Sequence, residues 1–284
     1  MKILVCIKQV PDTVEVKIDP KTGTLIRDGV PSIINHDDKT GIEAALRIKE
    51  QLGGTVTVVS MGPPQADVAL REALAMGCDD AYLVSAREFG GSDTYATSGI
   101  IAAALKHIGY DLIITGRQAI DGDTAQVGPQ VAEKLGLTQI TYAEEILEVG
   151  DGKIKVKRHI DGGVETVEGP LPIVITVNGS AAPCRPRNAK LVQKYKHAKT
   201  ITEKQQGNLD YTDLYDTRDY LNLVEWSVAD VNGDLKQCGL SGSPTKVKAI
   251  QNIVFQAKES KTISGSDREV EELIVELLEN HTIG

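Results

Sequence analysis

Short apolar runs alternate with helical patterns along the first half of the chain, and this alternation constrains the fold more than any other feature. The apolar runs, each expected to be a strand, occupy residues 3–7, 56–60, 81–84 and 112–115. The helical patterns occupy residues 38–52, 65–76 and 94–108, and a fourth ends near Leu135. Alternation of this kind is typical of a parallel sheet with helices on both faces. We therefore predict an α/β fold built on a doubly wound, mostly parallel sheet.

Further segments are expected to add to this sheet. Three β-rich segments, at residues 141–149, 153–159 and 172–177, should extend the sheet or pair antiparallel along its edge. The sequence Asp-Pro-Lys-Thr-Gly at residues 19–23 predicts a hairpin inserted after the first strand.

A glycine-rich segment follows the fourth strand and leads into a helix. Gly116 allows the backbone to turn at the strand end, and Gly122 and Gly128 leave room for close approach. Pro129 is tolerated only in the first turn of a helix, so the helix should begin near residues 126–128. Unpaired amides at a helix start can receive a phosphate group, so the predicted ligand is a nucleotide. A tight strand–helix connection with exposed acids is the alternative.

Composition narrows the class of protein. With 284 residues and 41% hydrophobic content, the chain can bury one large core or one core with an appendage. The formal net charge of −9 opposes affinity for nucleic acid. The sequence has neither an apolar window of bilayer length nor a signal-peptide pattern, so we expect a cytoplasmic protein without membrane insertion.

The four cysteines exclude several kinds of centre. Cys6, Cys78, Cys184 and Cys238 are widely spaced and form no CxxC pair. This spacing argues against an iron–sulfur cluster, a zinc ribbon or a disulfide framework, and we expect no metal site. A protein with this sequence that moves electrons would need an organic cofactor.

The character of the sequence changes after residue 180. We expect an α/β domain over residues 1–184, an irregular excursion over 185–235 and an extended C-terminal arm over 236–284. The arm ends in a predicted helix, because Ser266 and Glu269 have capping-box spacing. An apolar stripe follows the cap at Val270, Leu273, Ile274, Leu277 and Leu278. The stripe either folds back on its own domain or binds a partner.

Four segments, in order, resemble the beta subunit of electron transfer flavoprotein, a heterodimeric carrier of electrons between dehydrogenases. They are VCIKQVPD at residues 5–12, MGPP at 61–64, GRQAIDGDTAQVGPQVAEKL at 116–135 and VKRHIDGGVETVEGPLPIVIT at 156–176. The resemblance covers residues 1–180 closely and returns in GLSGSPTKV at 239–247, whereas residues 185–235 match poorly. It implies a nucleotide-binding sheet of the adenine nucleotide alpha hydrolase type and a C-terminal arm that wraps the flavin domain of an alpha subunit.

Family members divide by the cofactor of the beta subunit, which is a structural AMP or an FAD. Gly122, Thr124 and Val127 stand where the AMP type has Asp, Cys and Thr, so this chain resembles the FAD-binding, electron-bifurcating type. That type takes hydride from NADH and sends electrons to ferredoxin and to a high-potential acceptor. The acceptor is a flavin-dependent partner of the acyl-CoA dehydrogenase, enoyl-CoA reductase or lactate dehydrogenase kind. The alternative is a non-bifurcating carrier with AMP.

The resemblance and the strand-end positions together define the candidate site. The candidate cofactor-binding residues are Cys6, Lys8, Val10, Asn35, Asp38, Ser60, Met61, Gly62, Thr94, Thr97, Gly116, Gln118, Asp121, Gly122, Asp123, Thr124, Ala125, Gln126, Val127 and Gly128. No residue is expected to act as an acid–base catalyst, so the chain would be enzymatic only as a subunit of a complex.

Several of these residues have alternative interpretations. Lys8 could contact a flavin carbonyl or phosphate, or it could be solvated. Asp121 and Asp123 would repel phosphate, so one is expected to bind ribose hydroxyls or to stabilise the loop. Thr94 and Thr97 could donate to the ligand or cap their helix.

The segment before the first helix departs from the family. His36 stands where the family has proline, so Asn35 and Asp38 carry over while His36 and Asp37 do not.

Two further observations leave alternatives open. Residues 90–94 partly resemble the phosphate loop of ATP pyrophosphatases, but that loop follows the first strand, where this chain has KQVPD. The aromatic residues of the excursion, Tyr211, Tyr215, Tyr220 and Trp226, could determine partner choice or tether the segment to the domain.

Overall fold

The computed structural model describes residues 1–12, 31–181, 183–207, 209, 211–246, 260 and 262–280. The chain divides into two compact units, Met1–Lys248 and Ala249–Gly284, and each is described by itself. The hairpin expected at residues 19–23 lies outside the described residues.

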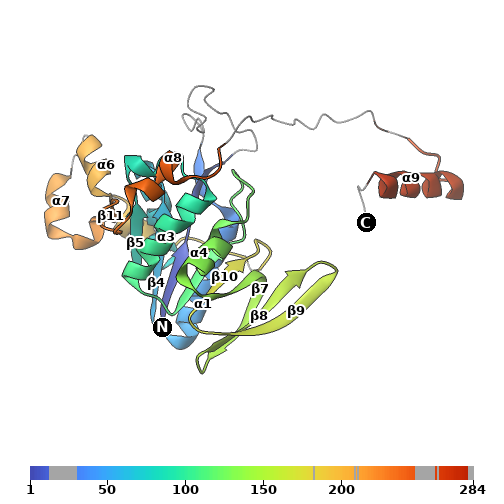
Figure 1. Ribbon diagram of the computed structural model, residues 1–284, viewed down its shortest axis with the longest axis horizontal. Helices are drawn as coiled ribbons and strands as arrows, with labels where there is room; N and C mark the ends of the chain where they lie inside the picture. Colours follow the sequence, from blue (N-terminus) through green and yellow to red (C-terminus); the bar gives the residue numbers. More distant parts are fainter. Residues whose placement is uncertain are drawn as a thin grey trace. The chain divides into compact units, whose positions relative to one another are not determined.

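The first unit is built on a nine-stranded sheet with the order β11-β5-β4-β1-β6-β10-β7-β8-β9 (Figure 1). The strands from β11 to β7 in this order are parallel: β11 (Val224–Trp226), β5 (Asp80–Val84), β4 (Thr55–Met61), β1 (Lys2–Cys6), β6 (Leu112–Gly116), β10 (Ile173–Val177) and β7 (Thr138–Gly150). The edge strands β8 (Lys153–Ile160) and β9 (Gly163–Pro170) are antiparallel. This confirms the predicted α/β fold with a mostly parallel sheet and an antiparallel edge.

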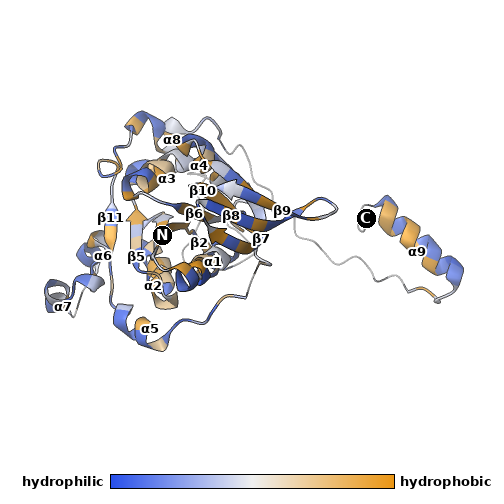
Figure 2. Ribbon diagram, turned by 90° about the horizontal axis from the view of Figure 1, so that it is seen from below, coloured by the Kyte–Doolittle hydropathy of each residue, from blue (hydrophilic) through white to orange (hydrophobic). Residues whose placement is uncertain are grey.

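Helices cover both faces of the sheet (Figure 2). One face packs against α1 (His36–Leu52) and α2 (Asp67–Met76), and the other packs against α3 (Thr94–Ile108) and α4 (Val127–Leu135). Ile3 and Val5 of β1 point into the first core, whereas Leu4 and Cys6 point into the second. Strands buried on both faces need apolar side chains at nearly every position, which is why β6 and β10 read as continuous apolar runs.

The structure differs from the sequence expectations at two strands, because β9 was not expected and β10 has a different position. β9 has mostly exposed side chains on both faces, so it lacks the apolar alternation that indicates a strand. β10 was expected at or beyond the edge, but it lies between β6 and β7 and is parallel to both. A separate two-stranded antiparallel pair, β2 (Gln9–Pro11) and β3 (Ser32–Ile34), flanks the carboxyl end of β1.

Residues 185–235 contain short helices and the edge strand β11. The helices are α5 (Ala189–Tyr195), α6 (Ile201–Gln206) and α7 (Thr212–Thr217). Tyr195 and Leu223 are buried in the same core as α1 and α2, and Trp226 of β11 packs on Tyr82 with ring centroids 4.7 Å apart. Single apolar side chains thus attach this segment to the existing core.

Short 3-10 turns and one more helix connect these elements. They are η1 (Pro64–Ala66), η2 (Arg87–Phe89), η3 (Asp219–Leu221), η4 (Leu235–Gln237) and α8 (Gly239–Gly242).

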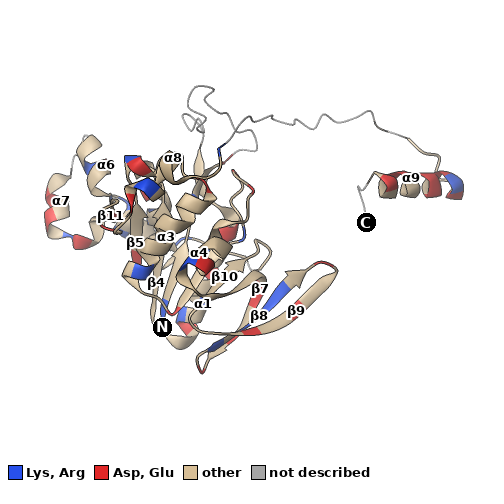
Figure 3. Ribbon diagram, in the orientation of Figure 1, with Lys and Arg blue, Asp and Glu red and all other residues tan. Residues whose placement is uncertain are grey.

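The second unit contains α9 (Asp267–Glu279). The Ser266 side chain accepts a hydrogen bond from the Glu269 amide, which confirms the expected N-cap. Val270, Ile274 and Leu278 form an exposed stripe, and the charged side chains of the helix are nearly all acidic (Figure 3). Within the described part of the chain, none of the helices has the length and apolar character required to cross a bilayer.

The contact of α4 with the sheet depends on Gly128. A Cβ at this position would lie 2.7 Å from Thr115 Oγ1 and 2.8 Å from Thr176 Cγ2. We expect Gly128→Ala to lower the free energy of unfolding by about 1–3 kcal/mol, because the helix must move off the strands. Urea denaturation measures the change. Gly122→Ala is the control, since no atom lies within 4 Å of its Cβ position, and it should change stability by less than ~0.5 kcal/mol. Equal stabilities of the two variants would contradict this packing argument.

Candidate functional site

The site lies where the winding of the sheet changes direction. From β1 the chain moves outward to β4 and β5, and it then returns to form β6 on the other side of β1. β1 and β6 are parallel neighbours, with Cys6 paired to Thr115 at their carboxyl ends. Ligands of open parallel sheets bind in the crevice at such a switch point. The segments that follow β1 and β6 therefore lie together at the expected position.

Asp38, in the first turn of α1, joins these two segments. Its Oδ2 atom accepts a hydrogen bond of 2.7 Å from the Lys8 amide, and its Oδ1 atom accepts one of 3.0 Å from the Gly116 amide. The residue is only 7% exposed. Burial raises the pKa of Asp38 from 3.8 to about 7, although hydrogen bonds from Lys8, Asn35 and Gly116 oppose the rise.

Asn35 holds the next part of the loop. Its Nδ2 atom donates to the Gln118 carbonyl at 2.8 Å, and its Oδ1 atom accepts from the Ile120 amide at 3.1 Å. The Asn35 amide donates to the Lys8 carbonyl at 2.9 Å. Asn35 is fully buried, so its polar groups are satisfied by the loop rather than by water.

Lys8 and Asp121 form an ion pair across the crevice. Lys8 Nζ lies 2.6 Å from Asp121 Oδ1, and the side chains are 42% and 3% exposed respectively. The acids of the loop were expected either to bind ribose hydroxyls or to stabilise the loop, and this contact of Asp121 stabilises the loop. Asp123 makes a second internal contact, because its Oδ1 atom accepts from Gln118 Nε2 at 3.0 Å.

The second part of the loop, residues 122–126, contains backbone amides without an acceptor among the described residues. Asp123 and Ala125 adopt left-handed backbone conformations, with φ of 46° and 52°. In the described residues, no acceptor is found for the backbone amides of Thr124, Ala125 and Gln126, and the Gln126 side chain does not cap α4. Gly122 faces open space. Free amides beside the start of a helix suit an anionic group.

The start of α3 adjoins the start of α4. Thr94 Oγ1 donates to Gln126 Oε1 at 2.8 Å, which links the two helix starts. Asp93 caps α3 by accepting from the Ala96 amide at 3.0 Å, so neither Thr94 nor Thr97 has the capping role considered above. Asp93 was not among the residues predicted from the sequence.

Asp93 also receives the segment that follows α8. The Thr245 amide and hydroxyl donate to Asp93 Oδ2 at 2.9 and 2.7 Å, and the Asp93 amide donates to Ser243 Oγ at 2.8 Å. The aspartate within a Ser-Asp-Thr sequence before a helix is a capping signal that could have identified this residue.

The other candidate residues differ in their access to the crevice. Cys6, Val10 and Ser60 are buried, and burial followed by the charge of Asp38 raises the pKa of the Cys6 thiol to about 12. Met61 and Gly62 are partly exposed at the end of β4, where the Gly62 amide donates to the Val84 carbonyl at 3.2 Å. Gly128 is packed against the sheet, so the close approach expected there is that of α4 to the strands.

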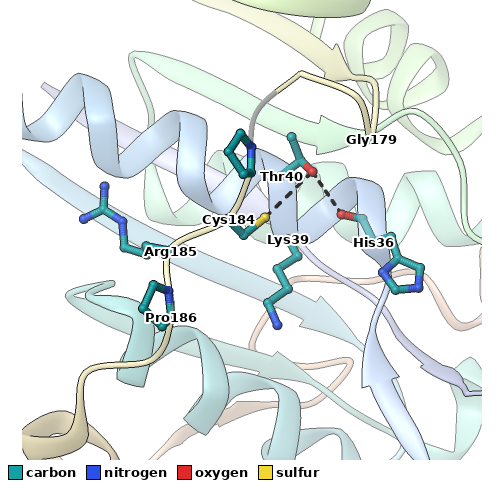
Figure 4. A pocket seen from close by; sticks show the side chains of 8 residues that line it. His36, Lys39, Thr40, Gly179, Cys184, Arg185 and Pro186 are labelled. Carbon is teal, nitrogen blue, oxygen red and sulfur yellow. Dashed lines mark hydrogen bonds between the residues drawn. The ribbon is translucent and has the colours of Figure 1, made fainter.

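A hollow of about 510 Å³, which the sequence did not indicate, opens beside the first turn of α1 (Figure 4). Its lining residues are His36, Lys39, Thr40, Gly179, Pro183, Cys184, Arg185 and Pro186. Arg185 contacts Glu43 at 2.7 Å and Glu50 at 2.5 Å, so its charge is already paired. Among the described residues, no cluster of three or more His, Cys, Asp or Glu side chains is arranged to hold a metal ion.

Comparisons with known proteins identify the family. The model of the electron transfer flavoprotein domain matches residues 22–206. The chain is 49% identical over 248 residues to the electron transfer flavoprotein subunit beta of Clostridium acetobutylicum, with 87% of this chain and 86% of the relative covered. The chain belongs to the electron transfer flavoprotein family, as a beta subunit. The expected resemblance is thereby confirmed.

Two relatives of this electron transfer flavoprotein beta subunit are named for reductase complexes. One is the caffeyl-CoA reductase-Etf complex subunit CarD of Acetobacterium woodii, which is 47% identical, with 87% of this chain and 86% of the relative covered. The other is the acryloyl-CoA reductase electron transfer subunit gamma of Anaerotignum propionicum, which is 43% identical over the full length of both chains.

The raised pKa of Asp38 predicts a pH dependence of stability. Since the pKa is 3.8 in the unfolded chain and about 7 in the folded chain, folding takes up a proton between these values. The stabilising contribution is fully present below about pH 4 and is lost as the pH rises to about 7. We expect Asp38→Asn to flatten this part of the curve of unfolding free energy against pH. Asp79→Asn, at the opposite end of the sheet, is the control and should keep the slope. A slope unchanged in Asp38→Asn would contradict the assignment.

Proposed function

We propose that this electron transfer flavoprotein beta subunit binds FAD and acts in a complex that oxidises NADH and bifurcates the electrons. One electron would go to ferredoxin and the other to a high-potential acceptor in a flavin-dependent dehydrogenase or reductase. The names of the two reductase-complex relatives support an acyl-CoA reductase or dehydrogenase as the partner. The proposal places the complex in the cytoplasm.

The observation that carries a nucleotide cofactor is the open loop between β6 and α4, and the choice of FAD rests on the resemblance of Gly122, Thr124 and Val127 to the FAD-binding type. Gly122 leaves space beside the free amides of Thr124 and Ala125, and the small side chains there do not compete for those donors. These amides and the start of α4 would hold the phosphates of the cofactor. A structural AMP would use the same donors, so AMP remains the second candidate.

The residues of this chain would bind and orient the cofactor and exclude water. Bound FAD supplies the ability to accept a hydride and to release its two electrons singly. Lys8, with a side chain 42% exposed at the crevice, would place its positive charge beside the cofactor while it stays paired with Asp121. We assign no residue of this chain to proton transfer, in keeping with a subunit that has no complete active site alone.

The C-terminal unit is proposed to bind the alpha subunit. The exposed stripe on α9 offers apolar area, with Val270 38% and Ile274 46% exposed, for a complementary groove. The arm over residues 236–284 would then dock on the flavin domain of the partner.

The cofactor assignment is tested by Gly122→Asp combined with Val127→Thr. The added carboxylate places bulk and negative charge beside the amides that would hold the phosphates of FAD, and Val127→Thr replaces a methyl group by a hydroxyl at the start of α4. The fold has room for a Cβ at residue 122. We expect loss of the flavin of this subunit, with the alpha-subunit flavin retained, measured by flavin released per heterodimer. Gly163→Asp is the control, since nothing lies within 4 Å of its Cβ position in the hairpin of β8 and β9. Equal flavin contents of mutant and wild type would refute the assignment. A wild type that contains AMP and a single flavin would support the second candidate.

Electron bifurcation is tested with the reconstituted complex. A hydride delivers two electrons at one potential, so reduction of a low-potential ferredoxin must be coupled to reduction of a better acceptor. We expect NADH to reduce ferredoxin only when the high-potential acceptor is present, in about one-to-one electron stoichiometry. Full-rate NADH oxidation by the acceptor without ferredoxin, together with no ferredoxin reduction, would identify an ordinary carrier.

The partner assignment is tested by Leu273→Asp combined with Leu277→Asp. Two carboxylates in an apolar seam should abolish heterodimer formation, at a cost of several kcal/mol, while the isolated chain keeps its thermal transition. Size-exclusion chromatography and calorimetry measure the two effects. Val275→Asp, which lies off the stripe, is the control. A double variant that unfolds alone but binds its partner normally would favour folding back on its own domain.

A further inference from the structure

We propose that Asn35 and Asp38 are positioning residues that hold the loop between β6 and α4 against the end of β1 and do not contact the cofactor. The inference rests on the proposed function only in placing a cofactor at this loop. Both residues were expected from the sequence to contact the cofactor directly, so their role here is a different one.

The hydrogen bonds of Asp38 leave it little capacity for a ligand. Its two oxygen atoms accept from the Lys8 and Gly116 amides, at 2.7 and 3.0 Å. Both amides belong to residues at strand ends, where the sheet no longer supplies an acceptor. With 7% of its surface exposed, the carboxylate has almost no face that a cofactor could reach.

The side chain of Asn35 also bonds to the loop and leaves the helix beside it without a side-chain cap. Asn35 is the N-cap residue of α1, yet its side chain makes no cap hydrogen bond. An asparagine at this position commonly accepts from an amide of the first helical turn, which stabilises the helix by about 1 kcal/mol. Here the side chain instead donates to Gln118 and accepts from Ile120. The capping group is diverted to the loop, and its full burial keeps it from a ligand.

Gly116 provides a third observation. A Cβ at Gly116 would lie 2.2 Å from Asp38 Oδ1 and 2.8 Å from the Asp38 amide nitrogen. The glycine is therefore required by the close approach of α1 to the loop. A ligand is not needed to explain it.

Together these contacts fix the first half of the loop at successive points. Asp38 holds residue 116, Asn35 holds residues 118 and 120, and Lys8 holds Asp121. In the second half, Gln118 holds Asp123 and Thr94 holds Gln126, but the amides of Thr124, Ala125 and Gln126 have no acceptor within the described residues. A rigid first half determines where the amides of the second half meet an anionic group.

The experiment uses the isosteric Asp38→Asn and, separately, Asn35→Ala in the heterodimer, freed of the nucleotide of this chain but retaining the alpha-subunit flavin. Asp79→Asn is the matched control, since Asp79 Oδ2 accepts from the Val56 amide at 2.8 Å at the amino end of β4. Hydrogen–deuterium exchange of residues 116–122 is measured without ligand, and the affinities for FAD and for AMP are measured separately.

We expect both variants to raise the hydrogen–deuterium exchange rate of residues 116–122 about tenfold or more, because each loses a hydrogen bond to a charged or buried group. The amides of the other strands should stay protected. Affinities for FAD and AMP should fall by similar factors, and the control should change neither. Lower affinity with unchanged loop exchange would show direct contact and overturn the proposal. So would increased exchange across the whole sheet, or equal effects in the control. A wild type that binds AMP but not FAD would refute the proposed cofactor, and the AMP measurements would still decide the role of these residues.

Discussion

The end of a parallel strand leaves backbone amides without partners, and in this protein one buried carboxylate satisfies two of them. Asp38 accepts from the amides of Lys8 and Gly116, which follow adjacent strands but lie more than a hundred residues apart in the chain. This arrangement joins the two segments that leave the switch point in different directions. The position of the loop, and with it the orientation of its free amides, depends on this interaction.

Because of this arrangement, the side chain of Asp38 is buried and poorly hydrated. Burial favours the neutral form of Asp38, whereas each amide hydrogen bond favours the ionised form, and burial has the larger effect. A second acid of the loop, Asp121, is nearly as buried but has Lys8 as its partner at 2.6 Å. The site therefore contains one acid that is paired with a cation and one that accepts hydrogen bonds from the backbone. Among the residues that the structure describes, the amides of Thr124, Ala125 and Gln126 in the outer part of the loop have no acceptor.

The segment after residue 184 joins the same domain by packing on the existing core and sheet edge, without a core of its own. β11 adds to the edge of the sheet beside β5, and Arg185 joins Glu43 and Glu50 of α1 with ion pairs. Tyr195 and Leu223 complete the core under α1 and α2. A segment with too few apolar residues for its own core can thus be ordered by an existing one.

The sequence by itself determined the alternation of strands and helices, the parallel sheet, the start of α4 near Val127 and the N-cap of α9. These features depend on local periodicity and capping chemistry, which neighbouring residues encode. It also indicated the loop from Gly116 to Gly128, because glycines, a strand and a helix start adjoin one another there. The tertiary structure alone decided that β10 lies inside the sheet, that β11 forms its edge and that Gly128 serves helix packing. It also decided that Asn35 and Asp38 bond to the loop. Each of these depends on contacts between residues that are distant in sequence, and the hydrogen-bond partner of a polar side chain is defined only when the fold brings that partner within about 3 Å.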